Sequence, residues 1–260
     1  TTIWGASSSW TLTALPLFVW MGEILFRTKL SENLFKGLAP WMQRLPGGLI
    51  HVNVVGCALF AAISGSSAAT VATVEKMSIP ELRKRKYPEK ILLGSLAGSG
   101  TLGLLIPPSI ILIIYGVTVQ ESIAKLFIAG IIPGIMIALI FMSYVIVWSL
   151  INKKSMPKSN ENSSFLEKVK KSKQLMPVVL LILAVIGSIY TGIATATEAA
   201  SLGVVGALIL SYLQKSLNIE TFKDSLLGAT KTSCMIAFIL AGATFLSLAM
   251  GFTGLPRNLA

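Results

Sequence analysis

The stretch GSLAGSGTLGLLIPPS, residues 94–109, places glycines, serines and a Pro-Pro pair in one of the most apolar parts of the chain, where no charge occurs between Lys90 and Glu121. Glycine weakens a helix, and proline removes a backbone N–H and restricts the residue before it. The stretch therefore predicts a discontinuous helix over residues 91–117, broken near its middle.

The composition predicts an all-α polytopic membrane protein. Only 13% of the residues are charged, whereas soluble proteins average about 25%. Apolar runs without a charge recur along the whole chain: 1–22, 45–74, 91–120, 126–152, 174–197, 199–214 and 232–256. Because a helix needs about 20 apolar residues to cross a bilayer, most of these runs are long enough, and we expect multiple membrane passes and no soluble domain.

The basic residues indicate topology rather than a nucleic-acid partner, although the net charge is +11. Of 22 basic residues, four lie in 27–44, six in 76–90, seven in 153–173 and three in 215–231. If residues 45–74 enter and leave the membrane on the same side, all 20 of these basic residues lie on that side. If every apolar run crosses the membrane instead, only 16 basic residues lie on one side. Cytoplasmic loops carry excess Lys and Arg. The count favours a re-entrant hairpin over 45–76 that opens to the cytoplasm; a straight helix with a small-residue packing face is the alternative.

The hairpin would turn within ISGSSAAT, residues 63–70. Free backbone groups at membrane depth are tolerated only where protein or a watery cavity covers them, and half-helix ends present carbonyls to cations and N–H groups to anions. The turn and the helix break together offer hydroxyls and carbonyls without a carboxylate. This set suits a Na⁺ ion beside an anionic substrate, with no other metal and no cofactor.

Catalysis is not expected, because the sequence has no Ser-His-Asp set, no metal-ligand cluster and no phosphate loop, and its one histidine, His51, stands alone. Residues 27–44 carry charges on one face and large apolar side chains on the other, which predicts an amphipathic cytoplasmic arm helix. Residues 118–152 form a predicted transmembrane helix, and the polar residues 153–173 a cytoplasmic linker.

Six motifs, in this order and spacing, resemble the DctM-like large membrane subunit of tripartite ATP-independent periplasmic (TRAP) transporters. They are PLFVWMGEILFR, RLPGGL, ALFAAISGSSAATVATV, GSLAGSGTLGLLIPPSI, KLFIAGIIPG and GIATATEAASLGVVGAL. Glu75 and Lys86 depart from the usual pattern, which has glycine at both positions.

The resemblance implies a Na⁺-coupled elevator-type ion-transporter fold built from inverted repeats. Residues 1–26 would be a scaffold helix, 45–117 part of the transport domain, and 174–260 the start of a second repeat whose remainder is missing, so the chain is expected to be truncated. The expected function is import of a small organic anion, such as a C4-dicarboxylate or a sialic acid, across the bacterial inner membrane. The implied partners are a small DctQ-like membrane subunit and a periplasmic DctP-like binding protein.

By the same resemblance, Ser64 would share a Na⁺ ion with the backbone carbonyls of Gly103, Ile106 and Pro108. Six further residues are candidates for lining the substrate or ion cavity: Gly65, Ser66, Ser67, Ser99, Gly100 and Thr101. Two alternatives stay open, a sodium/anion secondary transporter that works without a binding protein and a non-transporting membrane scaffold subunit.

Overall fold

The computed structural model describes residues 10–28, 37–157, 172–173 and 175–253. Every regular element in these ranges is helical, so the all-α prediction is confirmed for them. The elements are η1 (Trp10–Thr13), α2 (Ala14–Arg27), α4 (Ile50–Ser64), α5 (Ser67–Lys84), α6 (Glu89–Gly100), η2 (Thr101–Leu104), α7 (Ile110–Val119), α8 (Ile123–Ile151), η3 (Lys153–Ser155), α10 (Met176–Tyr190), α11 (Ala196–Leu213) and α12 (Ile219–Thr253).

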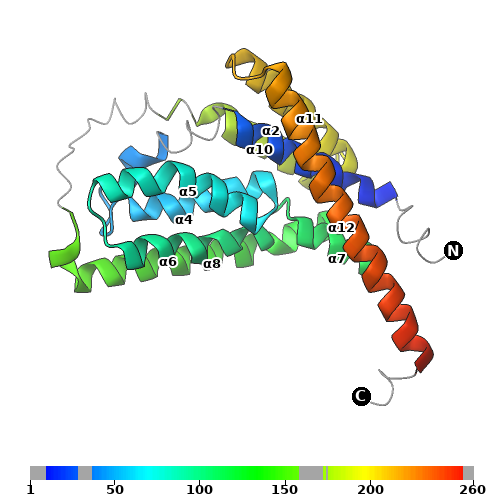
Figure 1. Cartoon of the computed structure of the whole chain (residues 1–260), viewed down its shortest axis with the longest axis horizontal. Coiled ribbons are helices and arrows are strands. Elements are labelled where there is room, and N and C mark those ends of the chain that lie inside the picture. The colour runs from blue at the N-terminus through cyan, green and yellow to red at the C-terminus, as the bar shows by residue number, and fades with distance from the viewer. Residues whose placement is uncertain (1–9, 29–36, 158–171, 174, 254–260) are drawn as a thin grey trace.

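The helices form two groups that meet at α2 (Figure 1). Helices α4, α5, α6 and α8 lie side by side and pack on one another, while α11 and α12 cross their direction at a steep angle. Helix α2 packs against α11 and α12 on one side and against α4 on the other. It therefore contacts both groups, and α10 also contacts α8 directly.

The chain reverses direction between α4 and α5 within two residues. Gly65 adopts a left-handed conformation with φ of +57°, which glycine reaches without steric cost. Ser66 then caps α5, since its side chain accepts a hydrogen bond from the Ala69 N–H at 3.4 Å. Helices α4 and α5 pack against each other as a helical hairpin.

The predicted interruption is present between α6 and α7. After α6 ends at Gly100, the chain makes a short 3₁₀ turn and starts α7 only at Ile110. Pro107 and Pro108 carry no N–H, so the carbonyls of Gly103 and Leu104 lose the donors that a continuous α-helix would give them. The Leu104 carbonyl instead accepts the Ser109 hydroxyl at 2.7 Å.

Three described helices are long and apolar enough to cross a membrane: α8, α11 and α12. Helices α4, α7 and α10 are apolar but shorter. The 35-residue α12 joins the charged residues before position 232 to the apolar run that begins there in one continuous helix. Its first turns pack on α2, where Arg27 lies 3.5 Å from Asp224, whereas Phe238 and Phe252 farther along are more than 80% exposed.

Some predicted boundaries fall outside the described residues. Of the predicted arm helix, residues 29–36 are not described, while residues 37–42 are helical. Of the predicted linker, only the two ends are described. The assignment of residues to scaffold, transport domain and second repeat stays a prediction.

Candidate functional site

The hairpin turn lies directly on the helix break. The Gly65 carbonyl accepts a hydrogen bond from the Ile110 N–H at 3.2 Å, which links the turn to the start of α7. A Cβ atom on Gly65 would come within 2.6 Å of the Pro108 carbonyl oxygen, and one on Gly103 would come within 2.9 Å of the Ser67 nitrogen. Both contacts are backbone against backbone. Only glycine permits this approach, and it brings the two polar segments into one site.

Hydroxyl groups gather on the hairpin side of this site. The Ser64 and Thr70 hydroxyl oxygens lie 2.8 Å apart, and both residues are buried. The Ser64 oxygen also accepts the Ser66 N–H at 3.3 Å. The buried Ser67 hydroxyl has no hydrogen-bond partner among the described residues. A buried hydroxyl without a hydrogen-bond partner is costly. A ligand that bonded to the Ser67 hydroxyl would offset this cost.

Helix α2 supports the turn from behind. A Cβ atom on Gly22 would lie 2.9 Å from the Ser64 Cα and 3.3 Å from the Ile63 carbonyl oxygen. Sequence reasoning missed Gly22, Thr70 and the buried Ser109. A signal for Gly22 existed, because it is the only glycine within α2. The sequence does not show that the Thr70 hydroxyl lies beside Ser64, because that contact depends on the direction in which α5 leaves the turn.

Four other predicted site residues make contacts outside the joint between the turn and the break. Ser99 is fully buried and its hydroxyl donates to the Ser95 carbonyl in its own helix. Gly100 packs against the Val71 side chain of α5. Thr101 is exposed and donates to the Gly98 carbonyl at 2.7 Å. The Ile106 N–H donates to the Leu102 carbonyl at 2.9 Å. The roles of these four residues stay predictions.

The donor chemistry of the site suits a hard monovalent cation. The hydroxyl groups of Ser64 and Thr70 and the Gly65 carbonyl lie where the turn meets the break. The N-termini of α5 and α7 also lie there, and helix N-termini favour an anion. Within the described ranges, no group of three or more His, Cys, Asp or Glu side chains is placed to hold a metal. Neutral oxygens bind an alkali cation, whereas zinc and similar ions prefer imidazole and thiolate ligands.

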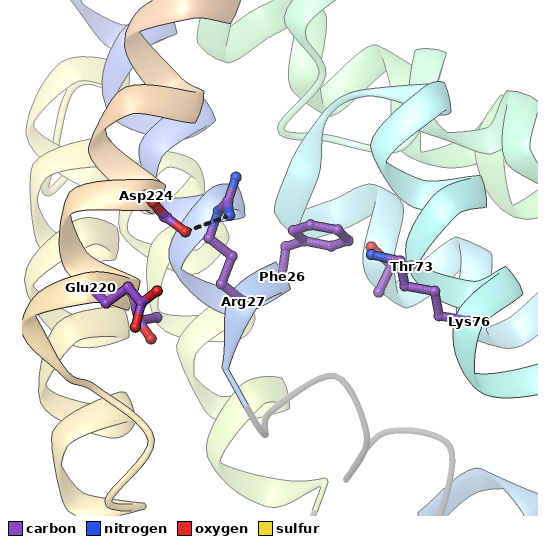
Figure 2. Close-up of a pocket in the computed structure, with 7 residues that line it drawn as sticks. Phe26, Arg27, Thr73, Lys76, Glu220 and Asp224 are labelled. Carbon is purple, nitrogen blue, oxygen red and sulfur yellow. Dashed lines mark ion pairs between the residues drawn. The ribbon is translucent and has the colours of Figure 1, made fainter.

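A separate pocket of about 420 Å³ lies between α2, α5 and α12 (Figure 2). Arg27 is paired with Glu23 at 3.0 Å and with Asp224 at 3.5 Å, which ties α2 to α12. On the opposite wall, the Lys76 ammonium lies 4.8 Å from the centre of the Phe26 ring. Such a cation–π contact at an exposed position contributes about 0.5–1 kcal/mol. The hairpin arm α5 is thus held to α2 here only weakly.

Comparison with known proteins identifies the family. Residues 1–260 match the family model described as the DctM component of the tripartite ATP-independent periplasmic transporter. The chain is 32% identical to the C4-dicarboxylate TRAP transporter large permease protein DctM of Pseudomonas aeruginosa, over 98% of this chain and 59% of that protein. It is 32% identical to the sialic acid TRAP transporter large permease protein SiaM of Vibrio cholerae, over 98% and 60%.

A third relative, the isethionate TRAP transporter permease protein DctMQ of Oleidesulfovibrio alaskensis, is 33% identical over 97% of this chain and 40% of its own length. The chain therefore spans about three fifths or less of the length of these relatives. The match covers every motif quoted above, together with the turn and the break that form the candidate site. The chain belongs to the DctM family of TRAP transporter large permease components, which is a family of transporter permeases and not of enzymes.

Proposed function

We propose that this chain forms part of the permease subunit of a Na⁺-coupled, binding-protein-dependent TRAP transporter that imports a small organic anion across the bacterial inner membrane. One observation carries the proposal: the hairpin turn is seated on the helix break, with Gly103 against Ser67 and the Gly65 carbonyl bonded to Ile110. An apolar segment does not need an interrupted helix for stability, because a continuous helix pairs its own backbone N–H and C=O groups.

The proposed Na⁺ ligands are the Ser64 hydroxyl and the carbonyls of Gly103, Ile106 and Pro108. The loss of the Pro107 N–H supports the role of Gly103, because its carbonyl has no α-helical donor. The anion would lie beside the ion, near Ser66 and Ser67, where α5 begins. A helix N-terminus carries partial positive charge and unpaired N–H groups, which favour an anion.

In this proposal α4 to α7 belong to the moving part, with α4 and α5 as a re-entrant hairpin, and α2 belongs to the part that stays fixed. The contact between Lys76 and Phe26 can break at low cost, whereas the packing of α4 on α2 would have to slide during the movement. The Arg27 pairs, by contrast, hold α2 and α12 together within the fixed part. A DctQ-like subunit and a DctP-like binding protein would complete the transporter.

The transport proposal predicts a double requirement. The full-length subunit with its small partner, reconstituted in proteoliposomes, should take up the organic anion only with both an inward sodium gradient and the cognate binding protein. ATP inside or outside should have no effect. Uptake of free substrate without the binding protein would favour the secondary-transporter alternative. Absence of uptake with every component present would favour the scaffold alternative.

The re-entrant hairpin predicts that both ends of the α4–α5 pair face the cytoplasm. In a full-length, otherwise cysteine-free protein, cysteines at the exposed positions Pro46 and Pro80 should react with a membrane-impermeant maleimide only from the cytoplasmic side. A cysteine at the exposed Gln120, beyond α7, serves as the control and should react only from the periplasmic side. Labelling of positions 46 and 80 from opposite sides would rule out the hairpin.

Ser64→Ala should weaken sodium binding. The substitution removes one oxygen ligand from the ion, which makes the free energy of sodium binding less favourable by about 1–3 kcal/mol. We therefore expect the half-saturating sodium concentration for uptake to rise roughly 5- to 150-fold, with activity partly restored at high sodium. Ser188→Ala is the matched control, because the Ser188 hydroxyl only donates within α10, at 2.8 Å to the Val185 carbonyl. A sodium curve for Ser64→Ala that overlays the wild-type curve would remove Ser64 from the site.

A further inference from the structure

A pocket of about 410 Å³ opens where residues 43–48, Tyr87 and the C-terminal end of α8 meet. It lies far along the α4–α5 hairpin from the turn that forms the candidate site, next to the start of α4. Gly47 and Gly48 shape its wall, with φ of +101° and +54°. The Tyr87 hydroxyl accepts the Leu49 N–H at 3.1 Å and so fixes this wall to the loop between α5 and α6.

The lining of the pocket includes two basic side chains. Arg44 and Lys153 both line it although they come from distant parts of the sequence, and no Asp or Glu of the described residues lines it. Neither side chain forms an ion pair in the described ranges, whereas the nearby Arg83 is paired with Glu89 at 2.7 Å. Two exposed cations facing one cavity without a carboxylate attract an anion.

The lining also includes apolar side chains, which adjoin the exposed apolar surface of α8. Leu150 lines the pocket and is 47% exposed, and Met156 lines it one turn beyond the helix end. Val147 and Ile151, on the adjoining surface of this 29-residue apolar helix, are 55% and 76% exposed. The pocket therefore sits where a membrane-spanning surface gives way to the charged residues Lys153 and Lys154.

We propose that this pocket binds an anionic phospholipid, with the headgroup phosphate between Arg44 and Lys153 and an acyl chain along Leu150 and the exposed surface of α8. Basic pockets at the cytoplasmic ends of transmembrane helices suit anionic headgroups. The apolar lining residues favour a lipid over a free phosphate ion, because a free ion would contact only the two basic side chains. A lipid held here would clamp the segment 43–48, from which the hairpin starts, to the end of α8.

The test is native mass spectrometry of the full-length subunit with its small partner, mixed with equal amounts of phosphatidylglycerol and phosphatidylcholine of the same acyl chains. The wild type should retain phosphatidylglycerol preferentially. The Arg44→Gln, Lys153→Gln double variant should lose this preference by about 30-fold, since we expect each of these two lining residues, in contact with the headgroup, to contribute about fivefold. Lys154→Gln, which removes the same charge one residue outside the pocket, should leave the preference unchanged.

Three outcomes would overturn the proposal. Equal loss in Lys154→Gln and Lys153→Gln would mean that the lipids respond only to overall charge. Displacement of phosphatidylglycerol by millimolar inorganic phosphate would identify a free-ion site. A wild type that retains both lipids equally would show that the pocket does not select an anionic phospholipid. Sodium-driven uptake by the double variant in phosphatidylcholine vesicles reports whether it is folded, independently of the lipid measurement.

Discussion

Sodium-driven uptake should fall at least tenfold when Gly103 is replaced by alanine. The added Cβ would lie 2.9 Å from the Ser67 nitrogen and 3.0 Å from the Ser66 carbonyl carbon. Both neighbours are backbone atoms of the hairpin turn, so neither can rotate away as a side chain would. Overpacking of this kind costs about 1–3 kcal/mol, and the turn must separate from the break to relieve it. Gly103→Val should be more severe, because a branched side chain also resists the open backbone.

Gly94→Ala is the matched control for this effect. Gly94 lies in α6, nine residues before Gly103, and a Cβ atom there would meet nothing within 4 Å. It should transport like the wild type, within a factor of about two, because an unhindered Gly to Ala change in a helix is neutral or slightly stabilising. Measuring the melting temperature and the sodium dependence of both variants separates a lost site from a lost fold. Equal uptake by Gly103→Ala and Gly94→Ala would show that the close contact does not matter.

Gly22→Val should raise the half-saturating sodium concentration more than tenfold, although residue 22 touches no proposed ligand oxygen. Its side chain would have to occupy space within 2.9 Å of the Ser64 Cα and 3.3 Å of the Ile63 carbonyl oxygen. The turn would be pushed off α2, and Ser64 would move away from the carbonyls of the break. Gly22→Ala should give a smaller shift in the same direction.

Gly187→Val in α10 is the comparison, since a Cβ atom at Gly187 would meet nothing within 4 Å. Uptake is measured in proteoliposomes over a range of sodium concentrations, with the binding protein saturating. An unchanged sodium curve together with a lower maximal rate for Gly22→Val would assign Gly22 to the movement of the hairpin. It would then have no part in shaping the sodium site.

The turn and the break were predictable because their cause is local. Gly65 reaches a left-handed backbone, and Pro107 and Pro108 remove N–H donors, whatever surrounds them. The polar groups of the two segments already suggested one shared site, and the family resemblance paired Ser64 with Gly103, Ile106 and Pro108. Nothing in the local sequence says that Gly103 meets Ser67, because that contact depends on how α4 to α7 pack.

The remaining parts depend on tertiary structure and escaped sequence reasoning. Thr70 lies beside Ser64 only because α5 folds back from the turn, and Ser99 bonds within its own helix although it reads as a cavity residue. The charged segment before residue 232 reads as a connector, yet it continues helically into α12 because it packs on α2, where Asp224 meets Arg27.

Helix α2 has one further consequence, which follows from two neighbouring residues. Gly22 faces the turn that holds Ser64, while the side chain of Met21 packs against Gly203 of α11. Binding free energies are reciprocal: if sodium at the turn favours one position of α2, that position of α2 favours sodium by the same factor. A change at the α11 contact, on the far side of α2 from any ligand, would therefore tune the ion affinity. In the proposed transporter, both groups of helices pack on α2, so a change in one group would alter the energetics of the other through this helix.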